Sequence, residues 1–101
     1  MAYRSPVPDD VAVELKRAVQ RWHQLPLDRA LAHATVLRAL VQELADAVAT
    51  ADGRPAEVVP DLGPRALPDQ LTVMAYDVCQ LDLQGDLSLA RRLVDVRRSL
   101  D

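Results

Sequence analysis

The sequence predicts an all-α protein, a four-helix up-down bundle with a proline-rich crossover segment between the second and third helices. Apolar residues recur at helical spacing in four stretches, which Pro or Gly residues separate. The apolar residues are mainly Leu, Ala and Val with no Phe, so the core has to be built from aliphatic side chains. The one long stretch without helical spacing, residues 53–66, is rich in helix-breaking residues, which also exclude a central strand. These residues are Gly53, Pro55, Pro60, Gly63 and Pro64.

The first helix is expected over residues 8–23, after a flexible N-terminal tail of residues 1–7. Pro8 suits the first helical position, and the acidic residues that follow it precede the basic ones, as the helix dipole favours. Its expected apolar face consists of Val11, Leu15, Ala18, Val19 and Trp22. A short break at Pro26 ends this helix, which predicts that the first two helices pack antiparallel.

The second helix, residues 27–52, is the longest stretch without Pro or Gly, and the other helices are expected to pack along it. Gly53 supplies the left-handed residue that ends it. At about 1.5 Å per residue its length is roughly 39 Å. One broad arc of its surface is apolar and is the predicted core face. This arc contains Ala30, Ala34, Leu37, Leu40, Val41, Leu44, Ala45 and Val48.

The third and fourth helices are expected over residues 68–83 and 86–100, as an antiparallel pair. Gly85 and Asp86 are the predicted stop and N-cap between them. The fourth helix has a clear apolar face and four arginines, whereas the third has three aspartates and no cation. This difference in charge predicts salt bridges between the two helices.

The third helix is apolar around most of its circumference, more than one core contact requires. It therefore needs a second partner, which is the 53–66 segment, a second copy of the chain or another protein. A small non-enzymatic module that mediates protein–protein interaction or homo-oligomerisation is the function that this surface favours. The expected interface consists of Val58, Val59, Leu62, Val73, Tyr76, Cys79 and Leu83.

Length and composition limit the other classes of function. A chain of 101 residues is one domain, expected over residues 8–101. Its net charge of −3 argues against a nucleic-acid partner. No apolar run approaches the ~18 residues of a membrane span, so no membrane partner is expected. Cys79 is the single cysteine, which favours the cytoplasm, and the balance of Arg, Ala, Val, Leu and Pro suggests a bacterial genome.

Residues that could support catalysis are few. The two histidines and the single cysteine show no metal-ligand spacing, so neither a metal nor another cofactor is expected. The alternative function is a small-molecule-binding or catalytic bundle, with a pocket between the second and third helices. Its polar groups would be His33, Tyr76 and Asp77, provided that these three side chains converge.

Overall fold

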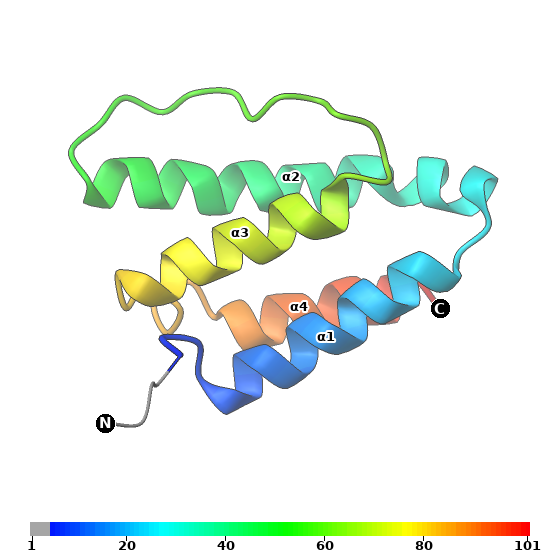
Figure 1. The fold of residues 1–101 in the computed structure, drawn as a ribbon, viewed down its shortest axis with the longest axis horizontal. Coiled ribbons are helices and arrows are strands. Elements are labelled where there is room, and N and C mark those ends of the chain that lie inside the picture. Colours follow the sequence, from blue (N-terminus) through cyan, green and yellow to red (C-terminus); the bar gives the residue numbers. More distant parts are fainter. Residues whose placement is uncertain (1–4) are drawn as a thin grey trace.

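The computed structural model describes residues 5–101, and within that range it contains four α-helices and no strand. The all-α prediction is therefore confirmed (Figure 1). The helices are α1 (Asp9–Gln24), α2 (Leu27–Ala51), α3 (Leu67–Gln80) and α4 (Leu89–Ser99). Residues 1–4 of the expected tail lie outside the described residues, and Val7 packs against the core.

The helices pack in two pairs, α1 with α4 and α2 with α3. Figure 1 shows that α1 and α4 run in one direction and α2 and α3 in the other. The expected close packing of α1 on α2 and of α3 on α4 is therefore wrong. Leu25 and Pro26 are both extended, and α1 and α2 diverge from this corner, so each helix finds its main partner elsewhere in the sequence.

The core follows the predicted apolar faces closely. In α2, seven of the eight predicted residues are buried, Ala45 is half-buried, and Ala49 is buried in addition. Trp22 of α1 is buried, and in the last helical stretch all four predicted core positions are buried. These four are Leu89, Leu93, Val96 and Leu100. No polar or charged residue within residues 5–101 is buried, so hydrophobic packing dominates the interior.

The ends of α2 and α3 share one backbone motif. Gly53 has φ +70, and the N–H of the residue after it donates to the Ala49 carbonyl at 2.8 Å. Asp82 has φ +56, and Leu83 N–H donates to the Val78 carbonyl at 3.0 Å. Both ends are Schellman motifs, in which a left-handed residue reverses the chain and satisfies the last carbonyls. The stop predicted at Gly53 is confirmed.

The stop and N-cap predicted at Gly85 and Asp86 are wrong. The left-handed residue after α3 is Asp82, and a further turn closed by a hydrogen bond from Leu87 N–H to the Leu83 carbonyl follows it. Ser88, with φ +50, ends that turn, and α4 begins directly after it. Asp is one of the few non-glycine residues that tolerate the left-handed conformation, which explains why no glycine is needed here.

The 53–66 segment runs back along α2 and is held by side chains from three helices (Figure 1). Gln42 of α2 makes two of these bonds, since its amide donates to the Glu57 carbonyl at 2.9 Å and accepts from Val59 N–H at 2.8 Å. Arg38 binds the Asp61 carboxylate at 2.9 Å. Two further side-chain bonds, at 2.9 and 3.0 Å, run from Gln70 to the Pro60 carbonyl and from Trp22 to the Pro64 carbonyl.

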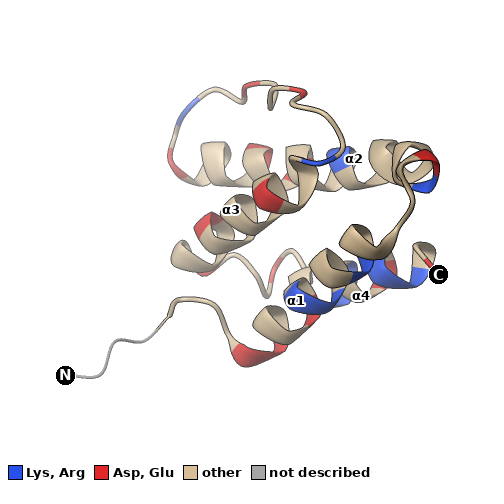
Figure 2. Ribbon diagram, turned by 45° about the vertical axis from the view of Figure 1, so that its right-hand side comes forward, with Lys and Arg blue, Asp and Glu red and all other residues tan. Residues whose placement is uncertain are grey.

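The charges are arranged differently from the expected α3–α4 salt bridges. Figure 2 shows cations along α1 and α4 and acidic residues on α3. Among residues 5–101, however, no ion pair joins α3 to α4. Arg92 binds Glu43 of α2, and Arg97 lies 3.6 Å from Glu14 of α1. The prediction is wrong because α4 lies beside α1 rather than beside α3.

Candidate interaction surfaces

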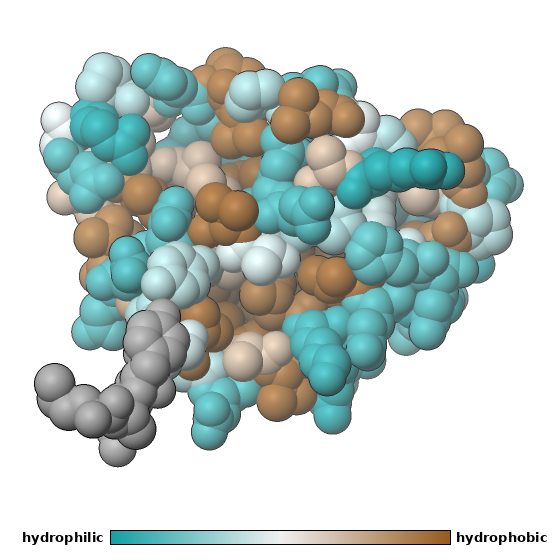
Figure 3. All heavy atoms as spheres, viewed as in Figure 1, coloured by the Kyte–Doolittle hydropathy of each residue, from teal (hydrophilic) through white to brown (hydrophobic). Residues whose placement is uncertain are grey.

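The predicted interface on α3 and the 53–66 segment is partly exposed. Val58 is 86% exposed and Val73 is 53% exposed, and both Leu62 and Tyr76 also lie at the surface. In Figure 3, the brown apolar side chains on this face form several groups that hydrophilic side chains separate. The residues named by the sequence therefore supply separate contacts rather than one continuous apolar patch.

The other three residues of that interface lie further inside. Cys79 is only 5% exposed, and Val59 and Leu83 are half-buried against the core. Burial raises the pKa of the Cys79 thiol, and the carboxylates of Asp10 and Asp82 raise it further. A thiol with a raised pKa and little exposure is a poor nucleophile, so Cys79 acts in packing.

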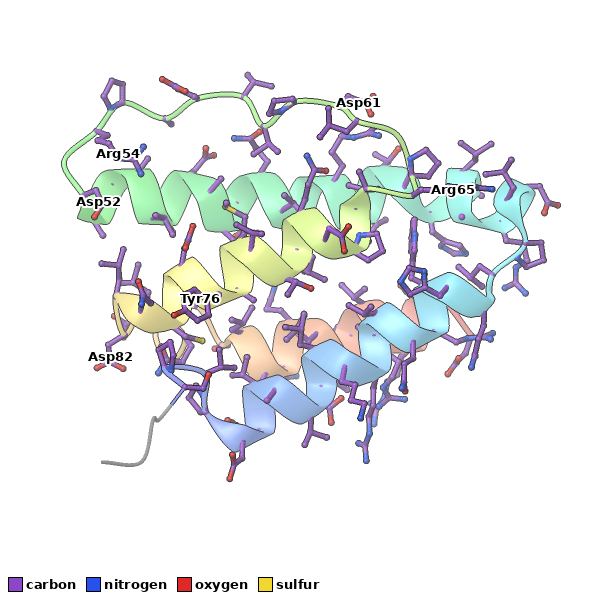
Figure 4. All side chains as sticks on the ribbon, viewed as in Figure 1. Asp52, Arg54, Asp61, Arg65, Tyr76 and Asp82 are labelled. Atoms are coloured by element: carbon purple, nitrogen blue, oxygen red, sulfur yellow. The ribbon has the colours of Figure 1, made fainter. Side chains whose placement is uncertain are left out.

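The structure does not bring His33 together with Tyr76 and Asp77. His33 lies in the second turn of α2, whereas Tyr76 and Asp77 lie near the C-terminal end of α3. The two helices run in the same direction, so these positions lie at opposite ends of the pair (Figure 1; Tyr76 is labelled in Figure 4). Tyr76 instead accepts a hydrogen bond from the Gln80 amide at 3.2 Å. This set cannot act as one acid–base site.

A cleft of about 380 Å³ lies where α1 ends, α2 begins and the 53–66 segment approaches α3. Trp22, Leu25 and Ala30 form its apolar wall, and His23 and Arg65 supply polar groups (Arg65 is labelled in Figure 4). Its volume is within the usual range for small-molecule sites. The sequence does not reveal this cleft because two distant segments build it, residues 22–30 and the end of the 53–66 segment.

A second surface that the sequence did not predict runs along α2 from its first turn to beyond its middle. Residues 29, 32, 36, 39 and 43 are spaced alternately by three and four, and all five are exposed. This spacing is that of the contact seam in paired helices. The seam, which we call the α2 seam, consists of Arg29, Ala32, Val36, Ala39 and Glu43. The apolar core arc of α2 is so strong that it obscures this weaker pattern on another face of the helix.

A groove of about 450 Å³ lies beside the α2 seam, between α2 and α4. The buried Leu40 and Val96 lie among its lining residues. Small side chains, among them Ala39 and Ser99, line it as well, and small side chains allow another helix to approach closely. Apolar and small side chains therefore form most of the groove.

Charged side chains occupy one end of the groove. Arg92 of α4 donates a hydrogen bond to the Glu43 carboxylate, and Asp95 also lines the groove. The hydrogen bond from Arg92 lowers the pKa of Glu43. The hydrogen bond to Glu43 raises the pKa of Arg92, and the Glu43 and Asp95 charges add to this increase. Two acids and one cation leave this end of the groove with a net negative charge.

In the part of the chain that the structure describes, no group of three or more His, Cys, Asp or Glu side chains is placed to hold a metal ion. None of the four helices combines the length and the apolar character needed to cross a membrane.

Comparisons with known proteins give no relative. The chain matches no protein-family model, no curated protein and no solved structure. The class that the fold and surfaces define is an all-α protein that exposes apolar side chains on α2, on α3 and on the segment between them.

Proposed function

We propose that this protein is a small non-enzymatic helical module that binds itself or another protein. The observation that carries the proposal is the number of large apolar side chains that the fold leaves exposed. They include Leu27, Leu31, Val36, Val58, Leu62 and Val73. Each of these side chains is an apolar contact that a protein partner would cover.

Two surfaces support this function in different ways. The α3 surface, with Val73 and Tyr76, presents an aromatic side chain, and aromatic residues are enriched in protein interfaces. The α2 seam adjoins a groove that could receive a helix from a partner. We expect the function to depend on at least one of these surfaces.

The 53–66 segment has a structural part in the proposal. We propose that it acts as a proline-rich crossover, which returns the chain along α2 so that α3 can run in the same direction as α2. The hydrogen bonds of Gln42 and Arg38 support this role. The lone, buried Cys79 supports a cytoplasmic location, where thiols stay reduced.

Native mass spectrometry of the protein purified from its own host at low salt tests this function. We expect a dimer or a stoichiometric complex with another chain. A bare monomer would contradict the proposal. A monomer that carries a reproducible small molecule would instead favour a ligand function, and the cleft beside Trp22 and Arg65 would be the site to test.

A further inference from the structure

We infer that the α2 seam binds the α2 seam of a second copy of this chain, in an antiparallel, two-fold symmetric dimer. This inference rests on the proposed function and names the partner and the orientation. The spacing of the seam places five exposed residues along about 21 Å of one helix face. The three central residues, Ala32, Val36 and Ala39, are apolar, and two of them are small.

The charges of the seam select the antiparallel orientation. Arg29 and Glu43 lie seven residues to either side of Val36, at the two ends of the seam. In an antiparallel pair centred on Val36, each Arg29 lies level with Glu43 of the other copy. In a parallel pair, Arg29 would face Arg29 and Glu43 would face Glu43, which is unfavourable. The seam is therefore complementary to itself in one orientation.

The groove gives the second copy a place to lie. Ala39 and Glu43 of the seam also line the α2–α4 groove, together with Asp95 and Ser99 of α4. At the charged end of this groove, the two acids Glu43 and Asp95 outnumber the single cation Arg92. Within residues 5–101, Arg29 takes part in no ion pair, so its guanidinium can bind these acids across the dimer.

A two-fold axis suits this surface better than the α3 surface. A symmetric interface requires that each patch complement itself, with the same residues on both sides. The α2 seam meets this requirement through Arg29 and Glu43, whereas the exposed part of α3 around Val73 and Tyr76 has no cation to balance its aspartates. One helix pair with its groove gives an interface at the small end of the known range, at most about 1,200 Å², so the dimer should be weak and concentration-dependent.

Sedimentation equilibrium of the purified recombinant chain, alone and over a wide range of concentration, tests this inference with charge reversals. In an antiparallel dimer, Arg29→Glu and Glu43→Arg each replace two attractions by two repulsions. Each variant should dissociate about tenfold more readily than the unmodified chain. An equimolar mixture of the two should form a heterodimer, and the double variant R29E/E43R should dimerise as the unmodified chain does.

Controls separate a lost interface from a damaged fold. Glu43→Arg also removes the pair with Arg92, so circular dichroism and thermal unfolding should show that each variant keeps its helices. Recovery of the dimer in the mixture would show that both single variants are folded and that the two ends of the seam meet.

Two results would overturn the inference. One is a chain that stays monomeric at every concentration, and the other is a dimer that the single charge reversals leave unchanged. A recombinant monomer, found together with a second chain bound to the protein from its host, would refute the α2 dimer and leave the proposed function standing. A bare monomer in both experiments would refute both.

Discussion

Two faces of α2 differ in what covers them. On one face, Gln42 binds two backbone groups of the 53–66 segment and Arg38 binds its Asp61, so that the segment covers the side of the helix away from the core. On another face, Val36 is more than half exposed, and the seam centred on it remains open. The same helix therefore carries one face that the chain covers itself and one face that stays exposed.

The difference shows how a small domain assigns its surfaces. A long polar side chain such as Gln42 can satisfy the backbone of an irregular segment, which has no hydrogen-bonded partner strand or helix. Small apolar side chains such as Ala32 and Ala39 offer no such bonds, but they allow a helix to approach closely. The first arrangement holds the 53–66 segment on α2, and the second suits the proposed α2 dimer.

The largest expected effect compares two leucines of α2. Leu44 is 1% exposed in the core and Leu31 is 55% exposed. Leu44→Ala should lower the free energy of unfolding by about 2–5 kcal/mol, because it leaves a cavity. Leu31→Ala should change it by no more than about 0.5 kcal/mol. Urea unfolding measured on dilute, monomeric protein checks both values, and equal losses would contradict the burial assigned to the two leucines.

The next effect concerns the 53–66 segment, which covers one face of α2. Gln42→Ala removes both bonds to the 53–66 segment and should cost about 1–3 kcal/mol. The amide of Val59 should then exchange its hydrogen faster, because it loses its acceptor. The matched control is Gln20→Ala, an exposed position on α1 that should leave both measurements unchanged. Unchanged exchange at Val59 in the Gln42 variant would show that the segment is held by other contacts.

The smallest effect is the pH dependence of the Glu43–Arg92 pair. The pKa of Glu43 is lower in the folded protein than its usual value of 4.5, because Arg92 binds the ionised carboxylate. The pair therefore stabilises the fold above pH 4.5, and this contribution is lost as the pH falls through the lowered pKa. For a surface pair it should amount to less than about 1 kcal/mol.

Urea midpoints measured from neutral pH down to about pH 3 check this expectation. Glu43→Gln should remove that part of the pH dependence and leave the remainder. A variant whose stability follows the same pH profile as the unmodified chain would show that Arg92 contributes nothing through Glu43.

The sequence predicted the helices and the core more fully than the surfaces. Helical spacing identified α1 and α2 to within one residue, and it identified all four core positions of the last helical stretch. The start of α4 was placed three residues early, because the left-handed conformation falls on Asp82 and Ser88 rather than on Gly85. Local propensity does not predict a left-handed Asp or Ser with the reliability of a glycine.

The packing partners and surfaces could not be predicted for a different reason. Whether α4 lies beside α1 or α3 depends on the direction in which each connection leaves its helix, and spacing along one helix does not contain that information. The cleft beside Trp22 and the α2–α4 groove each combine segments that are far apart in the chain. Val36 was not predicted for another reason, because it lies outside the dominant apolar arc of α2.

The most direct test of the account compares two valines. Val36 on the α2 seam and Val73 on α3 are both 53% exposed, and both lie within helices. The molar mass of Val36→Asp, Val73→Asp and the unmodified chain should be measured by light scattering at the same high concentration. Only Val36→Asp should abolish the dimer. A dimer that survives Val36→Asp and is lost in Val73→Asp would move the interface to α3 and contradict the α2 dimer.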